Sequence, residues 1–240
     1  MALSAYFISD AHLGIDPPDC VPEREARLVE FLKSIEGKAS HVVIVGDLFE
    51  FWYEYDYYVS NAHFDLLLAL KKLVDAGTDV HLMCGNHDFA YGKFFPSKLG
   101  VLVHKELVLS IQGKKILFRH GDGVAKSDYG YRLMRRIIDF PLNRWLFKQI
   151  HPDVGMSIAR FVGRNSRKYG ASRIIKLDEY LNWCERRMAE KGCDCCIFGH
   201  IHIPGVWNVK NGVAASSGDW IKKLTYLQME AGEISVKEFC

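Results

Sequence analysis

The sequence predicts an α/β protein in which a sandwich of sheets is flanked by helices and carries a helical insertion. Apolar strand-like segments alternate with helical segments over the first third of the chain, which is the pattern of βαβ units. Short strand-like segments joined by turns follow from about residue 107, and a basic block with helical periodicity interrupts them. With 240 residues, 49% hydrophobic and 25% charged, the chain has the size and composition of one domain, residues 1–240.

The first half contains five predicted elements. Ala5–Ile8 is a short apolar strand, and a helix with proline at its start covers about Pro22–Ile35. The β-branched segment His41–Val45 predicts a second strand, Ala62–Asp75 a second helix and Asp79–Met83 a third strand. Two successive βαβ units therefore predict a parallel sheet.

The second half predicts a different pattern of elements. Leu107–Ile111 and Lys115–Arg119 are joined by a short polar turn and predict a hairpin. A helix over Leu177–Lys191 and a strand over Asp194–Phe198 then return to the core. The C-terminal tail predicts a meander with hairpin turns at Asn211-Gly212 and Ala231-Gly232.

Residues 128–170 predict a helical lid, interrupted by Pro141, Pro152 and Gly163, that lies over the sheets. Although the whole chain carries a net charge of +2, residues 126–176 hold 12 lysines and arginines against 3 acidic residues. Aromatic and aliphatic side chains alternate with the basic ones, a combination that suits a polyanionic ligand or an anionic membrane surface. The basic residues expected to meet the membrane are Arg132, Arg135, Arg136, Arg144 and Lys148.

The sequence features that bear on cellular compartment are the N-terminus, the apolar runs and the cysteines. The N-terminus passes directly into a strand without a basic segment or a cleavage site, and no run of 18 apolar residues occurs. We therefore expect a cytoplasmic protein with peripheral contact to the inner face of the membrane. Seven cysteines are an odd number, and Cys195-Cys196 on an apolar strand predict free, buried thiols rather than disulfides or a zinc site.

Side chains that bind metals follow five predicted strands directly. Because loops at the carboxyl ends of strands form the ligand crevice of α/β sheets, these segments are expected to converge. The five segments are Ser9-Asp10-Ala11-His12, Gly46-Asp47, Gly85-Asn86-His87-Asp88, His120-Gly121-Asp122 and Gly199-His200-Ile201-His202.

The spacing and the kinds of ligand predict two metal ions. Residues i and i+2 of extended backbone point the same way, so Asp10 with His12, and His200 with His202, can each direct two ligands at one centre. Carboxylate, imidazole and amide ligands favour Mn²⁺, Fe²⁺, Co²⁺ or Zn²⁺, and we expect two divalent ions, Mn²⁺ first among them. Seven ligands exceed what one such ion needs. The predicted ligands are Asp10, His12, Asp47, Asn86, His120, His200 and His202.

The order of these motifs resembles that of the calcineurin-like metallophosphoesterases, over the span from Asp10 to His202. The resemblance implies a four-layer α/β/β/α sandwich and a bridging Asp47. It implies one metal on Asp10, His12, Asp47 and His202, and the other on Asp47, Asn86, His120 and His200. Two such metals activate water and stabilise the charge of a phosphoryl group during hydrolysis.

The same resemblance suggests catalytic residues. We expect His87 to face the phosphate and to stabilise its charge or protonate the leaving oxygen, and Asp88 to orient that imidazole. The alternative for His87 is a structural histidine beside the metals. Histidines outside the five motifs are expected to be ordinary core or surface residues.

The motif from Asp47 to Trp52 and the basic lid are most similar to one branch, the UDP-2,3-diacylglucosamine pyrophosphohydrolases of lipid A biosynthesis. This similarity implies substrate contacts from Asn86, His87, Asp128, Ser166, Arg173 and His200. The chain departs from the branch in having Glu50 for Asp, His87 for Arg, Gly170 for Asn and Arg173 for Lys.

The function expected from the resemblance is hydrolysis of UDP-2,3-diacylglucosamine to UMP and 2,3-diacylglucosamine 1-phosphate. One alternative is a metal-dependent phosphodiesterase or phosphatase that acts on soluble nucleotides or small phosphoesters. A second is a nuclease. We expect no nucleic-acid partner, because the basic and aromatic residues form a compact helical block rather than an extended stacking groove.

Overall fold

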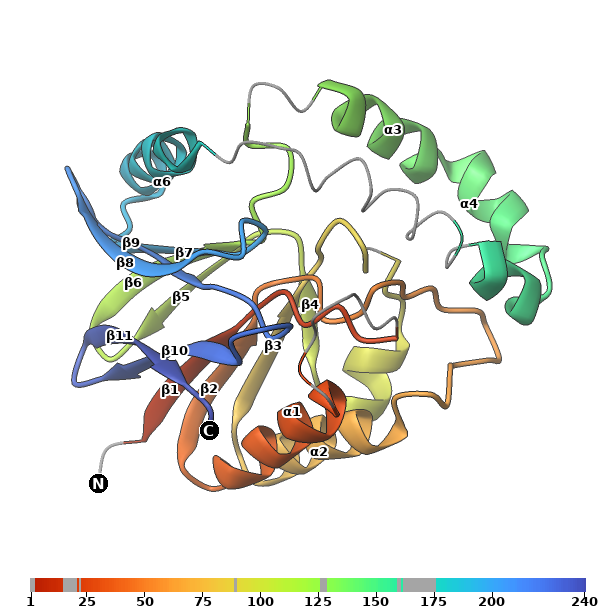
Figure 1. Ribbon diagram of the computed structural model, residues 1–240, viewed down its shortest axis with the longest axis horizontal. Coiled ribbons are helices and arrows are strands. Elements are labelled where there is room, and N and C mark those ends of the chain that lie inside the picture. Colours follow the sequence, from red (N-terminus) through yellow and green to blue (C-terminus); the bar gives the residue numbers. More distant parts are fainter. Residues whose placement is uncertain are drawn as a thin grey trace.

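Two β-sheets form the centre of the protein (Figure 1). The computed structural model describes residues 3–14, 21, 23–88, 90–125, 129–158, 161 and 176–240. The first sheet has the strand order β11-β10-β1-β2-β3-β4, in which β1 to β4 run parallel and β10 pairs with β1 antiparallel. Its strands are β1 (Ser4–Ile8), β2 (Ala39–Ile44), β3 (Asp79–Met83), β4 (Leu102–His104), β10 (Thr225–Glu230) and β11 (Glu233–Glu238).

The second sheet has the order β5-β6-β7-β9-β8, and β6, β7 and β9 run parallel at its centre. The hairpin of β5 and β6 supplies one edge and that of β8 and β9 the other. The strands are β5 (Leu107–Ile111), β6 (Lys114–Arg119), β7 (Cys195–Phe198), β8 (Pro204–Val209) and β9 (Gly212–Ser217).

Three apolar cores hold four layers together. Between the sheets, fully buried side chains such as Phe7, Val43 and Phe118 face one another. The outer face of the first sheet packs against α1 (Arg24–Ser34) and α2 (Phe64–Asp75), and that of the second against α6 (Leu177–Lys191). Burial of these apolar faces is the main stabilising contribution. The predicted four-layer α/β/β/α sandwich is confirmed.

The elements with predicted bounds agree with the structure to within one or two residues. The C-terminal tail has both predicted hairpin turns, but the hairpins β8–β9 and β10–β11 join different sheets, so the tail is not the expected meander. Two elements were not predicted, the short edge strand β4 and the π-helix η1 (Phe95–Leu99). A three-residue strand gives almost no periodicity, and Pro96 obscures the helical character of η1. Cys193, Cys195 and Cys196 are free and buried as predicted.

The described part of the predicted lid is helical and lies on the side of the molecule where the parallel strands end (Figure 1). It consists of α3 (Tyr129–Asp139), α4 (Pro141–Lys148) and a helical segment over residues 152–158. Pro141 and Pro152 each stand in the first turn of a helix, where proline is favoured. Within the residues described, none of the helices combines the length and apolar character needed to cross a bilayer.

Candidate metal centre

The five predicted loops meet at the carboxyl ends of β1, β2, β3, β6 and β7. Backbone hydrogen bonds connect the loops, from Asp10 N to the Gly46 carbonyl at 3.1 Å and from Gly199 N to the His120 carbonyl at 2.8 Å. The backbone N–H of His200 donates to both carboxylate oxygens of Asp10, at 3.1 and 3.0 Å. Residues that are up to 190 positions apart are therefore held in one rigid frame.

Glycines next to the predicted ligands permit this close approach. A Cβ on Gly85 would lie 2.5 Å from the Asp47 nitrogen, and one on Gly46 would lie 2.5 Å from Nδ1 of His120. A Cβ on Gly199 would lie 2.7 Å from a carboxylate oxygen of Asp10. A side chain at any of these positions would displace a predicted ligand.

Five of the seven predicted ligands have left-handed backbone conformations. A positive φ is uncommon outside glycine and costs on the order of 1–3 kcal/mol when the residue is strained, although Asp and His tolerate it better than most. Such residues concentrate where surrounding contacts fix a functional geometry. The φ values are 54° at Asp10, 47° at His12, 51° at Asp47, 71° at His200 and 56° at His202.

The first cluster contains Asp10, His12 and His202, with Asp47 beside it. Ligand atoms of Asp10, His12 and His202 all lie within 4.8 Å of one another. Nε2 of His12 is 3.8 Å from Asp10 and 3.6 Å from Asp47, and it has no hydrogen-bond partner in the described chain although it is buried. Burial lowers the pKa of His12, so its neutral ring offers a lone pair to this cluster.

The second cluster contains Asp47, Asn86, His120 and His200. Nε2 of His120 lies 3.2 Å from Asp47 and 3.1 Å from Oδ1 of Asn86, which in turn is 2.8 Å from Nδ1 of His200. Nδ1 of His120 is 2.8 Å from the Val45 carbonyl and must donate to it, so Nε2 is the atom left to ligate a metal. Burial and the neighbouring His120 lower the pKa of His200 to about 4, which leaves this imidazole neutral at pH 7.

The electrostatics of the site favour bound cations. Burial works to lower the pKa of His120, yet the adjacent Asp47 carboxylate outweighs burial and raises that pKa well above its usual value. The buried carboxylates of Asp10 and Asp47 thus favour positive charge at this site, and divalent ions bound between the two clusters would supply it. Carboxylate, imidazole and amide donors fit a first-row transition metal. The residues present fit two ions that share Asp47.

The structure corrects the role expected for Asp88. This carboxylate is fully buried, and no hydrogen bond or ion pair joins it to the His87 ring in the described part of the chain. Its oxygens accept hydrogen bonds from the backbone N–H groups of Asp47, Leu48, Phe49 and Gly85 at 2.7–3.1 Å and from the Tyr91 hydroxyl at 2.6 Å. Because these five donors occupy it, Asp88 fixes the loop that carries Asp47 rather than the imidazole of His87.

Glu50 is the carboxylate that meets the histidines, and sequence reasoning did not give it that role. Oε2 of Glu50 lies 3.0 Å from Nδ1 of His12, and Oε1 lies 3.5 Å from Nδ1 of His87. A carboxylate behind a metal-binding imidazole fixes its tautomer and orientation and makes the ring a stronger ligand. The available signal was its position three residues after Asp47 in a loop already marked as functional.

We therefore expect Glu50→Gln to weaken metal binding at the first cluster by about 10–100-fold, the usual effect of losing such a partner. The amide keeps the shape of the side chain but can donate to Nδ1, which favours the wrong tautomer of His12. Titration with Mn²⁺, followed by calorimetry, measures the affinity of each site. Glu54→Gln, four residues along the same loop, serves as the control. Unchanged binding at both sites would exclude this role for Glu50.

The structure also shows where the remaining predicted site residues lie. His87 is half-buried. Its backbone N–H donates to Oδ1 of Asp47 at 2.9 Å, and Nδ1 of its ring is 3.3 Å from the Glu50 carbonyl. A ring nitrogen of His87 is close enough to share an ion with His12 and Asp47, so geometry does not separate it from the ligands. Three predicted substrate contacts, Asp128, Ser166 and Arg173, lie outside the described residues.

Two arginines of the lid face the metal-binding loops. Arg132 donates to the carbonyls of Gly123 and Ala125 at 3.0 and 3.1 Å, beyond the His120 loop. Arg135 donates to the Gly85 carbonyl at 3.5 Å and pairs with Asp139 at 3.0 Å. These two side chains therefore attach α3 to the protein itself, contrary to the expectation that they meet a membrane.

Comparisons with known proteins agree with this geometry. Residues 3–204 match the calcineurin-like phosphoesterase family. The chain is 31% identical to the UDP-2,3-diacylglucosamine hydrolase of Pseudomonas putida, with 97% of each chain covered. It is 30% identical to the enzyme of that name from Aeromonas salmonicida, covering 96% of this chain and 91% of the other.

Solved structures show the same fold at low sequence identity. Vacuolar protein sorting 29 from Cryptosporidium parvum superimposes with a TM-score of 0.50 at 14% identity, covering 98% of this chain and 96% of the other. Its counterpart from Chaetomium thermophilum superimposes with a TM-score of 0.50 at 12% identity, covering 99% of this chain and 97% of the other. The family match spans all five ligand loops up to residue 204. The chain therefore belongs to the calcineurin-like phosphoesterase family, and it is a metal-dependent phosphoesterase.

Proposed function

We propose that this enzyme hydrolyses UDP-2,3-diacylglucosamine to UMP and 2,3-diacylglucosamine 1-phosphate. The observation that carries the proposal is the near-full-length similarity to proteins named UDP-2,3-diacylglucosamine hydrolase, together with two ligand clusters that share Asp47. The similarity extends past the family motifs into the lid, because it covers 97% of the chain. The proposal treats residues 1–240 as one domain with residues 128–170 as its lid.

In the proposed mechanism, the predicted ligands hold two metal ions and other side chains contact the substrate. Asp10, His12, Asp47 and His202 would hold one divalent ion, and Asp47, Asn86, His120 and His200 the other, with Mn²⁺ as the proposed metal. Such a pair supplies a nucleophile at neutral pH and positive charge for the phosphoryl oxygens. His87, which lies beside Glu50, is the proposed group that stabilises the developing charge or protonates the leaving oxygen. Asp128, Ser166 and Arg173 remain the proposed lid contacts to substrate.

Incubation with Mn²⁺ and UDP-2,3-diacylglucosamine in ¹⁸O water tests this reaction. We expect UMP and the sugar phosphate as products, with the label in UMP, because water is expected to attack the α-phosphorus. Label in the sugar phosphate would contradict that direction of attack. Absence of cleavage, alongside rapid hydrolysis of bis(p-nitrophenyl) phosphate or a soluble nucleotide, would reject the lipid substrate in favour of a small phosphoester. Salt-sensitive binding and cleavage of DNA or RNA would instead indicate a nuclease.

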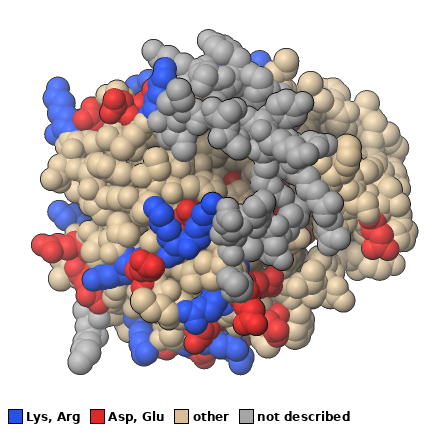
Figure 2. Space-filling view, in the orientation of Figure 1, with Lys and Arg blue, Asp and Glu red and all other residues tan. Residues whose placement is uncertain are grey.

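The lid is proposed to contact the anionic inner face of the membrane, where a cytoplasmic enzyme meets an acylated substrate. Large apolar side chains of α3 and α4 are exposed, and the surface over α4 at the right of Figure 2 is largely uncharged. Of the five basic residues first expected there, Arg136 and Arg144 have no ion-pair partner in the described chain, whereas Lys148 pairs with Asp56 at 2.6 Å. The exposed apolar residues include Leu133, Ile137, Phe140, Leu142, Trp145 and Leu146.

We expect the protein to sediment with anionic liposomes at low salt and Trp145→Glu to reduce the bound fraction several-fold, because the substitution places a negative charge among apolar groups. Phe64→Glu is the matched control, since Phe64 is 64% exposed on α2, a helix of the outer layer of the sandwich. Equal losses from both variants, or no sedimentation of the wild type, would reject membrane contact through the lid.

A further inference from the structure

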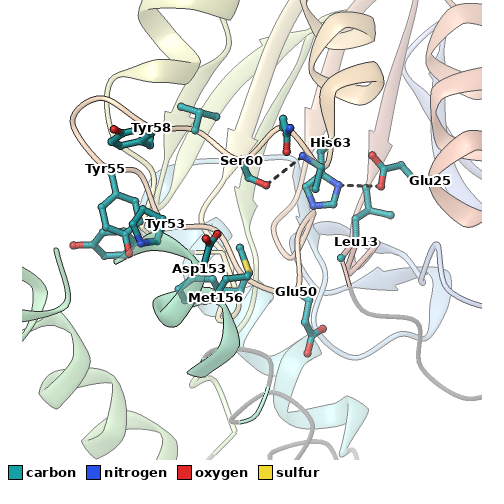
Figure 3. Close-up of a pocket in the computed structure, with 16 residues that line it drawn as sticks. Leu13, Glu25, Glu50, Tyr53, Tyr55, Tyr58, Ser60, His63, Asp153 and Met156 are labelled. Carbon is teal, nitrogen blue, oxygen red and sulfur yellow. Dashed lines mark hydrogen bonds and ion pairs between the residues drawn. The ribbon is translucent and has the colours of Figure 1, made fainter. Parts of the chain in front are cut away.

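A pocket of about 590 Å³ is lined by Glu50, Leu13, the tyrosines of the loop after Glu50, and His63 (Figure 3). Glu50, which holds His12, lines this pocket, and Leu13 and Gly14 follow His12 directly along the chain. The opposite wall is formed by the loop from Tyr53 to His63 and by the helical segment over residues 152–158.

The lining of the pocket combines tyrosines and polar side chains with aliphatic ones such as Leu13, Val59 and Met156. At the start of the loop wall, the rings of Tyr53 and Tyr55 contact each other with 5.2 Å between their centroids, and Tyr53 also packs on Phe147 of α4. Further along the same loop, Ser60 and His63 line the pocket, and Nδ1 of His63 lies 2.9 Å from Oε2 of Glu25. An acyl chain in the pocket would remove water from the polar groups of this lining, which is costly. The tyrosines and the polar side chains together suit a flat ligand with a polar edge.

Two side chains at the rim have no partner of their own. The ring of Tyr58 is 68% exposed and makes no aromatic or hydrogen-bonded contact with the described part of the chain. The side-chain amide of Asn61 is likewise without a hydrogen bond to any described residue. An exposed ring is a surface for stacking a nucleobase, and a carboxamide matches a base edge that offers one donor and one acceptor.

We propose that this pocket binds the nucleoside of the substrate, with the base stacked on Tyr58 and its edge paired with the amide of Asn61. This inference rests on the proposed function, because it assigns the uridine of UDP-2,3-diacylglucosamine. A substrate with a nucleoside on one side of the phosphorus and a lipid on the other needs two receptacles that diverge from the metals. The apolar face of α3 and α4 suits the lipid, and the pocket beside Glu50 suits the nucleoside.

The test compares the binding of UMP with that of ribose 5-phosphate at saturating Mn²⁺, using calorimetry on the full chain. Both ligands are phosphate monoesters of ribose, so the ratio of their dissociation constants isolates the base. We expect the wild type to prefer UMP, and Tyr58→Ala to reduce that preference on the order of tenfold, as loss of base stacking does. Asn61→Ala should reduce it by about 2–10-fold, the range for one hydrogen bond to a neutral group.

Tyr57→Ala is the matched control, because Tyr57 is the adjacent tyrosine, is 92% exposed and does not line this pocket. Its preference for UMP should equal that of the wild type, and melting curves check that all variants are folded. Equal affinity of the wild type for both ligands, or an unchanged preference in both Tyr58→Ala and Asn61→Ala, would overturn the inference.

The outcomes also separate this inference from the proposed reaction. Cleavage of the lipid substrate with a preference for UMP that does not depend on Tyr58 would reject the pocket and leave the reaction standing. A preference that depends on Tyr58, without cleavage of the lipid substrate, would support the pocket as a nucleotide site and reject only the lipid.

Discussion

Asp47→Ala is expected to abolish turnover and to remove both metal ions. Asp47 is 1% exposed, and its Oδ2 atom lies 3.6 Å from Nε2 of His12 and 3.2 Å from Nε2 of His120, so it faces both clusters. Burial raises the pKa of Asp47, but the adjacent His120 and His87 outweigh burial and hold that pKa well below its usual range. Without this anion, each site loses a charged ligand and the repulsion between the two cations is no longer compensated.

Elemental analysis after desalting, combined with turnover of bis(p-nitrophenyl) phosphate, measures both effects. Asp47→Asn separates charge from shape, because an amide oxygen can still accept the N–H of His87, which lies 2.9 Å from Oδ1. We expect this variant to fold like the wild type and to bind the ions weakly. Asp65→Ala, on the exposed surface of α2, controls for nonspecific losses. Two tightly bound ions in Asp47→Ala would contradict the bridging role.

The fold was largely predictable because local and global preferences agree. In β2 the β-branched run Val42-Val43-Ile44 is buried on both faces, as expected of a central parallel strand. The segments over α1, α2 and α6 also carry apolar residues at helical spacing. β4 was missed because three residues show almost no hydrophobic periodicity. η1 was missed because it is a single turn that contains Pro96.

The convergence of the predicted metal ligands was predictable for a different reason. Each follows a strand that the sequence marks clearly, and parallel strands place their carboxyl ends at one edge. The left-handed backbone at Asp10, His12 and Asp47 was not predictable, because the contacts that stabilise it come from other loops. Spacing locates a ligand along the chain, whereas tertiary contacts set its direction.

The carboxylates around His87 show where sequence reasoning fails. Asp88 is adjacent to His87 in sequence, which made it the expected partner, yet the turn directs its side chain to the backbone of the Asp47 loop. Glu50 is 37 residues away from His87 and reaches it across the site. Similarly, the charge of Arg132 and Arg135 was predictable, but their inward direction depends on carbonyls of the loops that α3 covers.

His87→Ala is expected to lower kcat by about 10²–10⁴-fold, the usual contribution of a positioned acid–base or charge-stabilising group. Glu50 fixes the ring from one side, and the ring of His12 contacts it edge-on at 4.7 Å. These contacts orient the imidazole of His87, which remains partly exposed. Loss of such a group affects the reaction more than the binding of substrate, so we expect kcat to change more than KM.

Metal content decides between the two roles that the geometry allows for His87. Because its ring nitrogen lies near His12 and Asp47, loss of one ion in His87→Ala would identify it as a ligand, whereas two retained ions with low kcat would identify a group that acts on substrate. Near-wild-type turnover would leave it a structural role only. His87→Arg adds a further comparison, since the guanidinium keeps a positive charge at this position but cannot give up its proton. Partial activity in His87→Arg would show that stabilisation of charge, rather than proton transfer, is the main contribution of this residue.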